Sequence, residues 1–510
     1  MTAHISTVAF QGVEATLVDV QVQISSGIVA FNIVGLPDKA VAESRERVSA
    51  ALRSVGLALP AKRITVNMAP ADLPKEGSHF DLPIALGLLS AMGVLANDYL
   101  SRYYVVGELG LDGSVAAVSG VLPTAMAANG AGCGLICPGL CGPEAAWASD
   151  DIDILAADNL IQIVNHFKGS QVLTRPEPGL ETEVPILPDL ADIKGQEAGK
   201  RALEAAAAGG HHLLMVGPPG AGKSMLASRL PSILPAMDAT EMLEVSMIAS
   251  VSGDLSNGVL SARRPFRSPH HSASQAALVG GGLKAKPGEM ALAHNGVLFL
   301  DELPEFQSRA LEALRQPLES GQTVIARANH HVTYPANFQL VAAMNPCKCG
   351  MAGEPGHVCK RGPRCASDYQ GRISGPLLDR MDIQIELPAV RASDLALPPP
   401  EETSSDVAQR VARARDIQRQ RFADLGLGHL RTNAQADGRL LEDIARLDAD
   451  GQSLLQDAAQ AMNLSARGYY RVLRVARTLG DLAGRCDISR TDIAEAISYR
   501  QQLASFSLAA

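Results

Sequence analysis

The stretch Gly217-Pro-Pro-Gly-Ala-Gly-Lys-Ser224 decides the fold of the central part of this 510-residue chain. It fits the phosphate-loop pattern G-x4-G-K-[ST] and directly follows an apolar run, His212-Leu-Leu-Met-Val216, that predicts a buried parallel strand. The glycines let backbone N–H groups surround phosphates, Lys223 reaches the β- and γ-phosphates, and the Ser224 hydroxyl can bind Mg²⁺. The residues predicted to bind ATP are Gly217, Pro218, Pro219, Gly220, Ala221, Gly222, Lys223 and Ser224.

A second motif, Val297-Leu-Phe-Leu-Asp-Glu302, is another apolar run that ends in two carboxylates. A nucleotide hydrolase needs one acidic side chain to order the metal ion and a second to activate water. We therefore expect Asp301 to bind Mg²⁺ and Glu302 to act as the catalytic base. Two strand-end motifs in this order predict binding and hydrolysis of a nucleoside triphosphate.

A third strand, Phe338 to Asn345, ends in a polar amide. In a parallel sheet the carboxyl ends of the strands meet at one edge, where ligands bind. Asn345 is therefore expected beside Lys223 and Asp301, where its amide would orient the attacking water or sense the γ-phosphate.

Composition excludes several classes of protein. A hydrophobic fraction of 46% and a charged fraction of 19% are typical of a globular chain. The sequence shows neither an apolar run of membrane-spanning length nor a signal-peptide pattern, so we expect a cytoplasmic protein that does not bind membranes. The net charge of −9 gives no whole-chain indication of nucleic-acid binding, although a small basic channel can lie within an acidic protein.

Changes in pattern along the chain predict its organisation. The front part alternates short strands with amphipathic helices, a polar and proline-bearing stretch follows it, and the part beyond the Leu397-Pro-Pro-Pro400 break is helical and rich in arginine. Leu303 to Gly321 is expected to form a helix. The predicted units are an α+β domain at 1–168, a linker at 169–187, an α/β nucleotide-binding domain at 188–395 and a helical domain at 396–510.

Two basic segments are candidates for contact with DNA phosphates. Asp301 follows Lys223 by 78 positions, more than one crossover helix needs, and the excess contains Arg263, Arg264 and Arg267. The second segment reads as a hairpin from Thr323 to Tyr334. Its candidates are Arg327, His330 and His331; the alternatives are a solvated loop and an ordinary polar turn.

Four cysteines lie within 19 residues: Cys347, Cys349, Cys359 and Cys365. Four thiolates form the closed tetrahedral site typical of structural zinc, and the basic residues around them would lower the thiol pKa values. We expect a structural Zn²⁺ site in the loop 347–365. His357 could replace one cysteine, and free thiols on a loop are the alternative.

The motifs together resemble the ComM/YifB family, whose members are magnesium-chelatase-like AAA+ ATPases. The resemblance rests on the phosphate loop, on the segment around Asp301 and on three further stretches: Met344-Asn-Pro-Cys347, Arg267-Ser-Pro-His-His-Ser-Ala-Ser274 and Arg372-Ile-Ser-Gly-Pro-Leu-Leu-Asp-Arg-Met-Asp382. It implies an α/β fold with an AAA+ P-loop core and a helical C-terminal lid of the magnesium-chelatase type.

The front domain resembles the Lon-type protease domain through Pro74-Lys-Glu-Gly-Ser-His-Phe-Asp81 and Gly107-Glu-Leu-Gly-Leu-Asp-Gly113. A Ser–Lys protease needs a lysine that accepts the serine proton. The alignment places His79 where that family has its serine and Leu122 where it has its lysine. We therefore expect a Lon-like α+β scaffold that lacks the catalytic dyad.

The ComM/YifB resemblance also implies a function and further site residues. It implies a homohexameric ring that couples ATP hydrolysis to DNA branch migration during natural transformation. Asn345 matches the family's sensor 1, Arg380 its arginine finger and Arg467 its sensor 2. The alternatives are that Arg380 pairs with a neighbouring aspartate, Asp379 or Asp382, and that Arg471 or Arg474 is the sensor 2 residue.

Three other functions are compatible with the same nucleotide site. A magnesium-chelatase motor would share the ATPase core, but chelatase motors lack a Lon-like front domain. An ATP-dependent protease or chaperone is disfavoured by the missing dyad. A non-catalytic ATP-gated scaffold is disfavoured because every expected hydrolytic residue is present.

Overall fold

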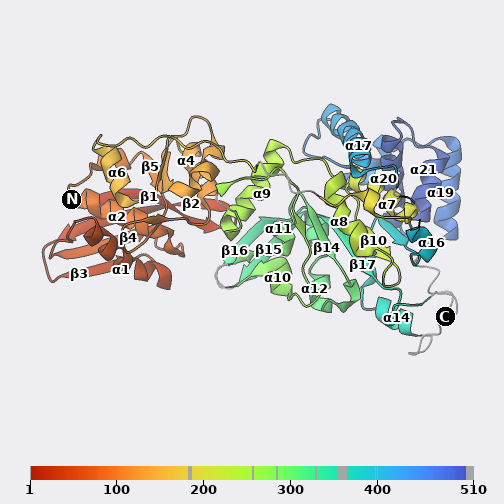
Figure 1. The fold of residues 1–510 in the computed structure, drawn as a ribbon, viewed down its shortest axis with the longest axis horizontal. Coiled ribbons are helices and arrows are strands. Elements are labelled where there is room, and N and C mark those ends of the chain that lie inside the picture. Colours follow the sequence, from red (N-terminus) through yellow and green to blue (C-terminus); the bar gives the residue numbers. More distant parts are fainter. Residues whose placement is uncertain are drawn as a thin grey trace.

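The computed structural model describes residues 2–181, 187–255, 258–282, 285–327, 330–352, 364–396, 398 and 400–500. Figure 1 shows an α+β unit at the N-terminal end, a central unit built on a parallel sheet, and helices of the C-terminal part at the opposite end. Within the described ranges, no helix combines the length and the apolar content that crossing a membrane requires.

The central sheet has five strands that pair in parallel. Their order across the sheet is β11 (Phe266–Arg267), β14 (Val297–Leu300), β17 (Gln339–Met344), β10 (Leu213–Val216) and β18 (Ile383–Glu386). The strands β10, β14 and β17 are buried along their whole length, which explains their uninterrupted apolar sequences. The predicted α/β class is confirmed.

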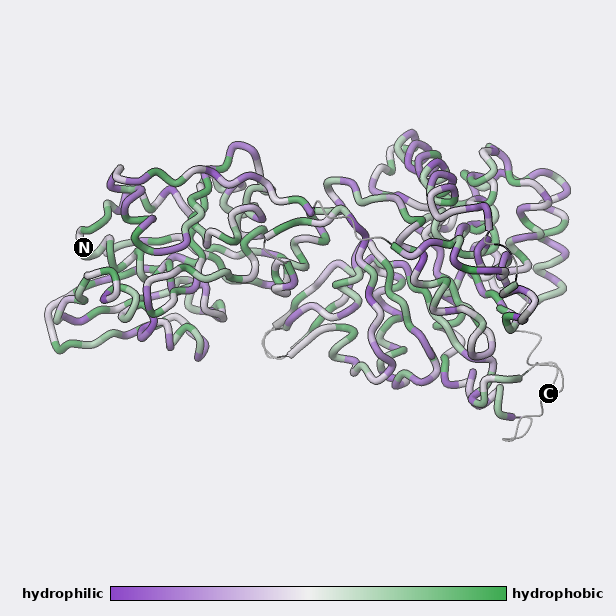
Figure 2. Tube along the Cα trace, viewed as in Figure 1, coloured by the Kyte–Doolittle hydropathy of each residue, from purple (hydrophilic) through white to green (hydrophobic). Residues whose placement is uncertain are grey.

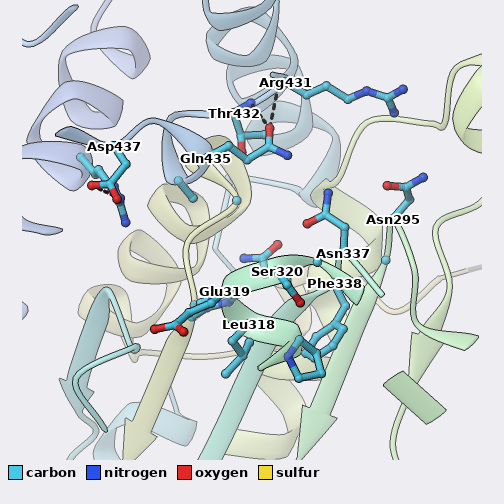
Figure 3. Close-up of a pocket in the computed structure, with 18 of the residues that line it drawn as sticks. Asn295, Leu318, Glu319, Ser320, Asn337, Phe338, Arg431, Thr432, Gln435 and Asp437 are labelled. Atoms are coloured by element: carbon cyan, nitrogen blue, oxygen red, sulfur yellow. Dashed lines mark hydrogen bonds and ion pairs between the residues drawn. The ribbon is translucent and has the colours of Figure 1, made fainter. Parts of the chain in front are cut away.

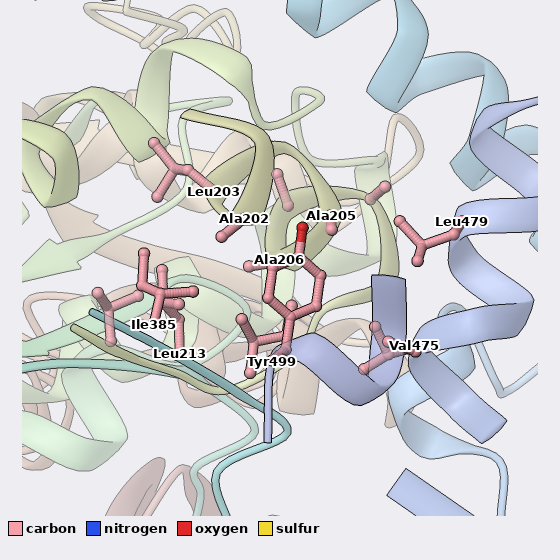
Figure 4. Packing of buried hydrophobic residues seen from close by; sticks show 14 of the residues in the cluster. Ala202, Leu203, Ala205, Ala206, Leu213, Ile385, Val475, Leu479 and Tyr499 are labelled. Carbon is pink, nitrogen blue, oxygen red and sulfur yellow. The ribbon is translucent and has the colours of Figure 1, made fainter. Parts of the chain in front are cut away.

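Helices of the central and C-terminal units share one hydrophobic core. The helix α7 (Glu197–Gly209) presents a run of alanines to α20 (Ala466–Leu482), and Figure 4 shows Ala205 and Ala206 beside Val475, Leu479 and Tyr499. Small side chains let these helices approach closely. The C-terminal helices are therefore packed onto the central unit rather than tethered to it.

The C-terminal part is helical, as the sequence predicts. Its elements are α16 (Ala392–Leu395), α17 (Ser404–Asp424), α18 (Gly438–Ile444), α19 (Ala449–Ala461), α20 and α21 (Arg490–Ser498). Figure 2 shows α17 as a largely hydrophilic helix, and its buried apolar residues recur every three to eight positions: Val407, Val411, Ala414 and Phe422.

The other elements of the central unit range in length from two residues in β12 to 14 residues in α9. They are α8 (Lys223–Ile233), α9 (Ala239–Ser252), α10 (Gln275–Val279), β12 (Gly280–Gly281), β13 (Lys286–Pro287), α11 (Glu289–Leu292), α12 (Ser308–Glu312), α13 (Pro317–Ser320), the hairpin strands β15 (Gln322–Arg327) and β16 (His330–Pro335), α14 (Cys365–Gln370) and α15 (Gly375–Leu378). The single helix expected from Leu303 to Gly321 is wrong, because the segment is broken into short pieces. Pro304 is the second residue of the helical turn Leu303–Glu305, and Pro317 is the first residue of α13, positions where proline's missing N–H is not needed.

The N-terminal unit is built on a seven-stranded sheet. Its order is β3 (Ala30–Val34), β4 (Arg63–Ala69), β2 (Glu14–Ser25), β1 (Thr2–Gln11), β5 (Tyr103–Val105), β8 (Gly134–Pro138) and β9 (Ile154–Ala157). The other elements are α1 (Lys39–Ser54), α2 (Asp81–Ala91), α3 (Asn97–Leu100), the pair β6 (Glu108–Leu109) and β7 (Val115–Ala116), α4 (Val121–Gly130), α5 (Gly142–Ala145) and α6 (Leu160–Phe167). The sheet is mixed, since β1 and β2 pair antiparallel and β3 and β4 pair parallel, which is typical of an α+β domain.

The two positions that align with the Lon dyad are buried in this unit. His79 packs between Phe10 and Phe80, and Leu122 is fully buried in the first turn of α4. The nearby Ser78 hydroxyl donates to the Glu108 carboxylate and not to a lysine. The geometry of a Ser–Lys nucleophile does not form at these positions.

The N-terminal unit is joined to the central unit through α9. The Gly120 N–H donates to the Ser250 carbonyl at 2.9 Å, and the buried Glu144 carboxylate accepts from the Ser250 hydroxyl and from the Leu122 N–H. Trp147, the only tryptophan of the chain, donates its Nε1–H to the Gly179 carbonyl at 2.8 Å. Gly179 lies within the predicted linker, and its carbonyl also accepts from the Leu260 N–H of the central unit at 3.0 Å, so this residue is held against both units.

We predict that Glu144 makes the stability of this junction depend on pH. Burial raises the pKa of the Glu144 carboxyl, although its two hydrogen bonds favour the charged form. The native state therefore holds the proton more tightly than the unfolded chain does, and each tenfold difference in proton affinity corresponds to ~1.4 kcal/mol. This contribution to stability is present below about pH 4.3, the pKa of an unfolded glutamate, and is lost as the pH rises through the raised native value.

Urea unfolding at several pH values, followed by Trp147 fluorescence, measures this effect. Glu144→Gln keeps an acceptor for the Leu122 N–H and should flatten the pH dependence relative to wild type. The exposed Glu177→Gln should leave the wild-type dependence unchanged. Parallel pH profiles for wild type and Glu144→Gln would rule out this assignment.

Candidate functional site

The phosphate loop connects β10 to α8 and depends on glycine at three places. Gly220 and Gly222 adopt φ values of +81° and +84°, in the left-handed region that favours glycine. A Cβ at Gly217 would lie 2.5 Å from the Leu387 carbonyl oxygen on the strand side of the loop. The glycines therefore allow both the turn and its close packing on the sheet.

Lys223 connects this loop to the end of β17. Its Nζ lies 2.6 Å from the Gly217 carbonyl oxygen, 2.9 Å from that of Pro218 and 3.1 Å from Asn345 Oδ1. Burial lowers the pKa of Lys223, and the charges of Asp301 and Glu302 oppose that effect. The lysine thus lies among the polar groups that the sequence predicts for phosphate binding.

Ser224 and Asp301 form the oxygen-donor pair expected for a magnesium site. The Ser224 hydroxyl donates to Asp301 Oδ2 at 2.6 Å across the loop and β14. A hydroxyl and a carboxylate are hard oxygen ligands of the kind that Mg²⁺ takes when most of its other ligands are water and substrate phosphate. The donor set therefore fits Mg²⁺ bound together with a nucleotide.

Glu302 directly follows this pair, with a left-handed φ of +52° that is uncommon for a residue other than glycine. Its N–H donates to Asp301 Oδ1 at 2.9 Å. Its Oε2 lies 3.1 Å from Nδ1 of His271, which sequence reasoning did not single out. The sequence signals were the pair His270-His271 and its place in the stretch Arg267 to Ser274, one of those on which the family resemblance rests.

A small cavity beside the phosphate loop was also missed. It measures about 250 Å³ and adjoins Ala198, Pro388 and Val390. Gln196 bridges it to the loop, because its Nε2 donates to the carbonyls of Ala221 at 3.1 Å and Pro388 at 2.8 Å. Lys194, Glu197 and Asp394 also line it, so the cavity combines apolar and charged walls next to the phosphate loop.

A second, larger cavity of about 750 Å³ lies at the opposite edge of the sheet. His212, Gly296 and Phe338 line it, and these residues come directly before the starts of β10, β14 and β17. Figure 3 shows Glu319, Asn337 and Phe338 across the cavity from Arg431, Thr432 and Gln435. Six arginines line it: Arg264, Arg415, Arg431, Arg467, Arg471 and Arg474.

The predicted arginines Arg380 and Arg467 belong to this opposite edge. Arg380 lies three positions before β18, and its ion-pair partner is Glu319, a cavity residue, rather than Asp379 or Asp382. Its buried Nε has no hydrogen-bond partner among the described groups. The phosphate loop follows β10, whereas the two arginines lie at the edge where β10 starts. Because this four-residue strand spans ~13 Å, neither arginine lies at the phosphate loop of its own chain.

The three lid arginines differ in their partners and in their exposure. Arg471 pairs with Asp382 at 2.6 Å, and Arg474 pairs with Asp437 at 2.9 Å. Both of these side chains are largely buried, whereas Arg467 is exposed where it lines the cavity. Of the three, Arg467 is therefore the side chain most accessible to an external phosphate.

The cysteine cluster lies just beyond Asn345. The sulfur atoms of Cys347, Cys349 and Cys365 lie within 4.8 Å of one another, and those of Cys347 and Cys349 are 2.8 Å apart. Cys359 and His357 lie outside the described residues. Three convergent thiols are soft donors that could hold a metal ion such as Zn²⁺.

The basic candidates for DNA contact are placed differently. Arg264 is engaged within the chain, because it pairs with Glu241 and donates to two carbonyls, and burial lowers its pKa to about 10. Arg267 forms two hydrogen bonds with Glu289, whereas Arg263 is half-buried. The hairpin is confirmed, and the side chains of Arg327, His330 and His331 at its end lie outside the described residues.

Three family models match the chain. They are "Magnesium chelatase, subunit ChlI" over residues 189–395, "Subunit ChlI of Mg-chelatase" over 20–139 and "Magnesium chelatase, subunit ChlI C-terminal" over 401–500. The first of them covers the whole parallel sheet, so the central unit is an AAA+ domain of the magnesium-chelatase type.

Similar proteins extend the match to nearly the whole chain. The competence protein ComM of Haemophilus influenzae is 43% identical over 498 residues, 96% of each chain. YifB of Escherichia coli is 42% identical over 97% of this chain and 96% of its own. The 38 kDa magnesium-chelatase subunit of Rhodobacter capsulatus is 27% identical over 60% of this chain and 84% of its own.

The chain belongs to the ComM/YifB family of AAA+ ATPases. The family assignment implies ATP and Mg²⁺ as the ligands of the site that Lys223, Ser224 and Asp301 form.

Proposed function

We propose that the protein is an ATP-driven DNA motor, a hexameric branch-migration helicase that acts in homologous recombination during natural transformation. The observation that carries this proposal is the separation of Lys223 from Arg380 and Arg467 at opposite edges of one sheet. A nucleotide site whose arginines lie on the far edge is completed by a neighbouring copy, which favours a ring. The name of the Haemophilus influenzae relative, a competence protein, supports the biological setting.

In the proposed hydrolysis, residues of one chain bind the nucleotide. Lys223 and the loop N–H groups hold the phosphates, while the Ser224 hydroxyl and the Asp301 carboxylate would hold Mg²⁺, which would supply charge neutralisation when bound. Glu302 accepts a proton from the attacking water, and Asn345 orients that water or the γ-phosphate. Glu302 and Asn345 follow neighbouring strands, which would bring them to the same phosphate.

The neighbouring chain supplies the positive charge. Arg380 is the proposed arginine finger and would leave Glu319 to reach the γ-phosphate of the adjacent subunit. Arg467 is the proposed sensor 2 residue, and it lines the same cavity as the alternatives Arg471 and Arg474. Because the cavity holds more arginines than acidic residues, it complements an anionic ligand.

The proposed DNA surface combines the hairpin β15–β16 with the segment before β14. Arg327, His330 and His331 come from the hairpin and Arg263, Arg264 and Arg267 from the segment, with the last two contributing after release of Glu241 and Glu289. Phosphate contacts would make DNA affinity fall with salt.

A magnesium-chelatase motor is the second candidate function, because all three matching family models carry that name. An ATP-dependent protease or chaperone has less support, since His79 and Leu122 occupy the aligned dyad positions. The DNA motor is favoured because the match to the competence protein covers 96% of this chain, whereas the match to the chelatase subunit covers 60%.

Strand displacement from a four-way DNA junction tests the proposal directly. Wild type with ATP and Mg²⁺ should separate the arms, while Lys223→Ala and Glu302→Gln should lose at least ~10²-fold in rate because phosphate binding or water activation is removed. The exposed Lys168→Ala should match wild type. ATP hydrolysis without any displacement would rule out the helicase, and ATP-dependent magnesium insertion into a porphyrin would favour the chelatase.

A mixing experiment tests whether Arg380 acts on a neighbour. Arg380→Ala and Glu302→Gln should each be inactive alone. In rings assembled from equal amounts, about a quarter of the interfaces would pair an intact Glu302 with an intact Arg380, so ATPase activity should return. If the mixture stays as inactive as its components, Arg380 is not supplied between subunits.

Metal analysis tests the proposed zinc site. Purified wild type should contain about one zinc per chain, since four thiolates close a tetrahedral site around one ion. Cys347→Ser should lose the metal, because it removes a buried ligand, whereas the exposed Cys486→Ser should retain it. Well under one zinc per wild-type chain would contradict the proposal and leave free thiols on the loop.

A further inference from the structure

The turn between β2 and β3 exposes two neighbouring apolar side chains. Ile28 is 90% exposed and Val29 is 66% exposed. Gly27 precedes them with a φ of +146°, a backbone conformation that favours glycine. Single exposed apolar residues are common on proteins, so this pair gains meaning only from what surrounds it. We call Ile28 and Val29 the apolar tip.

Exposed cations flank the apolar tip. Strand register places Arg63, the first residue of β4, opposite Ser25 in β2 and Ala30 in β3, the two residues that border the turn. Lys62 precedes Arg63, and both side chains are exposed. Neither of them forms an ion pair with another described residue.

A third cation lies at the same end of the sheet. The helix α1 connects β3 to β4, which pair in parallel, so it runs back toward the end where both strands begin. Its last turn carries Arg53, which is exposed and also has no ion-pair partner in the described part of the chain. Two apolar side chains and three cations therefore share one end of the N-terminal unit.

The other end of β2 lies on the hairpin β15–β16. A Cβ at Gly12, in the β1–β2 turn, would lie 3.0 Å from the Thr333 carbonyl oxygen, and Val13 packs against the buried cluster that contains Val332 and Tyr334. The 12 residues of β2 span ~40 Å, the length of about 12 base pairs of duplex DNA. Figure 1 shows β3 at the end of the N-terminal unit that faces away from the central unit. The strand β2 thus holds the apolar tip at a set distance from the hairpin.

Duplex DNA that is being opened fits this combination of groups. Aliphatic side chains of proteins insert between base steps, while Lys and Arg beside them hold the phosphates. Base pairs at a migrating branch point open as strands exchange, so their faces can be covered with little further unstacking. An anionic membrane would also attract the cations, but two aliphatic side chains provide little apolar area for insertion.

We propose that the apolar tip is a wedge that contacts opened base pairs at a DNA branch point, while Arg53, Lys62 and Arg63 bind the flanking phosphates. The inference rests on the proposed DNA motor and deepens it by naming the DNA structure that the N-terminal unit recognises. The tip covers the faces of the opened bases and so opposes their re-pairing. The hairpin, ~40 Å away on the same chain, contacts an arm of the same junction.

A four-way junction with 2-aminopurine at its branch point tests the wedge, because this base becomes more fluorescent when it loses its stacking neighbours. The full chain with Mg²⁺ and a non-hydrolysable ATP analogue should raise the fluorescence at least ~twofold, and a probe about ten base pairs along one arm should not respond. The double variant Ile28→Ser/Val29→Ser should lose this rise, while its affinity for the junction stays within about threefold because the cations remain.

With ATP, the same double variant should hydrolyse ATP at the wild-type rate but separate the arms at least ~tenfold more slowly, since nothing then opposes re-pairing. Leu111→Ser is the matched control, because it replaces a 65% exposed apolar residue of the same unit that lies beside Asp112 rather than beside cations. This control should behave as wild type in both assays.

Salt dependence tests the cations. Lys62→Ala/Arg63→Ala should weaken junction binding and reduce the slope of log K against log salt concentration by about two, since each phosphate contact contributes ~0.9. Lys39→Ala removes an exposed lysine at the start of α1, which pairs with Glu43, and should leave the slope unchanged. An unchanged slope in the Lys62/Arg63 double variant overturns the assignment of these cations to phosphates.

The remaining outcomes separate this inference from the proposed function. If wild type binds the junction and separates its arms, but the Ser variant matches it in both fluorescence and rate, the wedge alone is overturned. If wild type binds no junction DNA, the proposed function is overturned as well. A Ser variant that melts at the wild-type temperature but loses ring assembly, or loses binding to anionic phospholipid vesicles, would assign the tip to a second copy or to a membrane and overturn the wedge.

Discussion

Parallel pairing of β10, β17 and β14 is the constraint on which the site depends. The register places Val216 opposite Met344 and Leu300 opposite Ala342, so the three strands deliver their following residues to one edge. Lys223 meets Asn345, and Ser224 meets Asp301, without any side chain having to cross the sheet. Close packing of these buried strands keeps the distances fixed, because a slip of one residue would exchange the side chains that pack on the two faces of the sheet.

The same sheet separates two charge environments. The carboxyl edge carries Lys223 with Asp301 and Glu302, whereas the amino edge carries a cavity lined by six arginines. Burial lowers the pKa of Arg415 to about 9 in that cavity, where its described partner is a backbone carbonyl. One sheet thus carries an anion-binding loop on one side and an excess of cations on the other.

The sequence was sufficient to predict the class of fold and the meeting of Lys223, Asp301 and Asn345, since those residues follow apolar strands and strand ends converge. It did not predict His271 or Gln196, because their contacts depend on how distant segments pair. Gln196 reaches Pro388, which lies 192 positions away, and His271 reaches Glu302 only through the two-residue strand β11. The partner of Arg380 was missed for the same reason, since Glu319 is 61 positions away and the expected aspartates are adjacent or nearly so.

The arginine-lined cavity has a consequence for assembly in the proposed ring. Arginines outnumber carboxylates in this partly buried space, so a vacant interface carries an electrostatic penalty that a triphosphate of the adjacent copy would reduce. Subunit association and nucleotide binding would then be thermodynamically linked, with each favouring the other by mass action. The fraction of the protein assembled into rings would then rise with the ATP concentration in the cell.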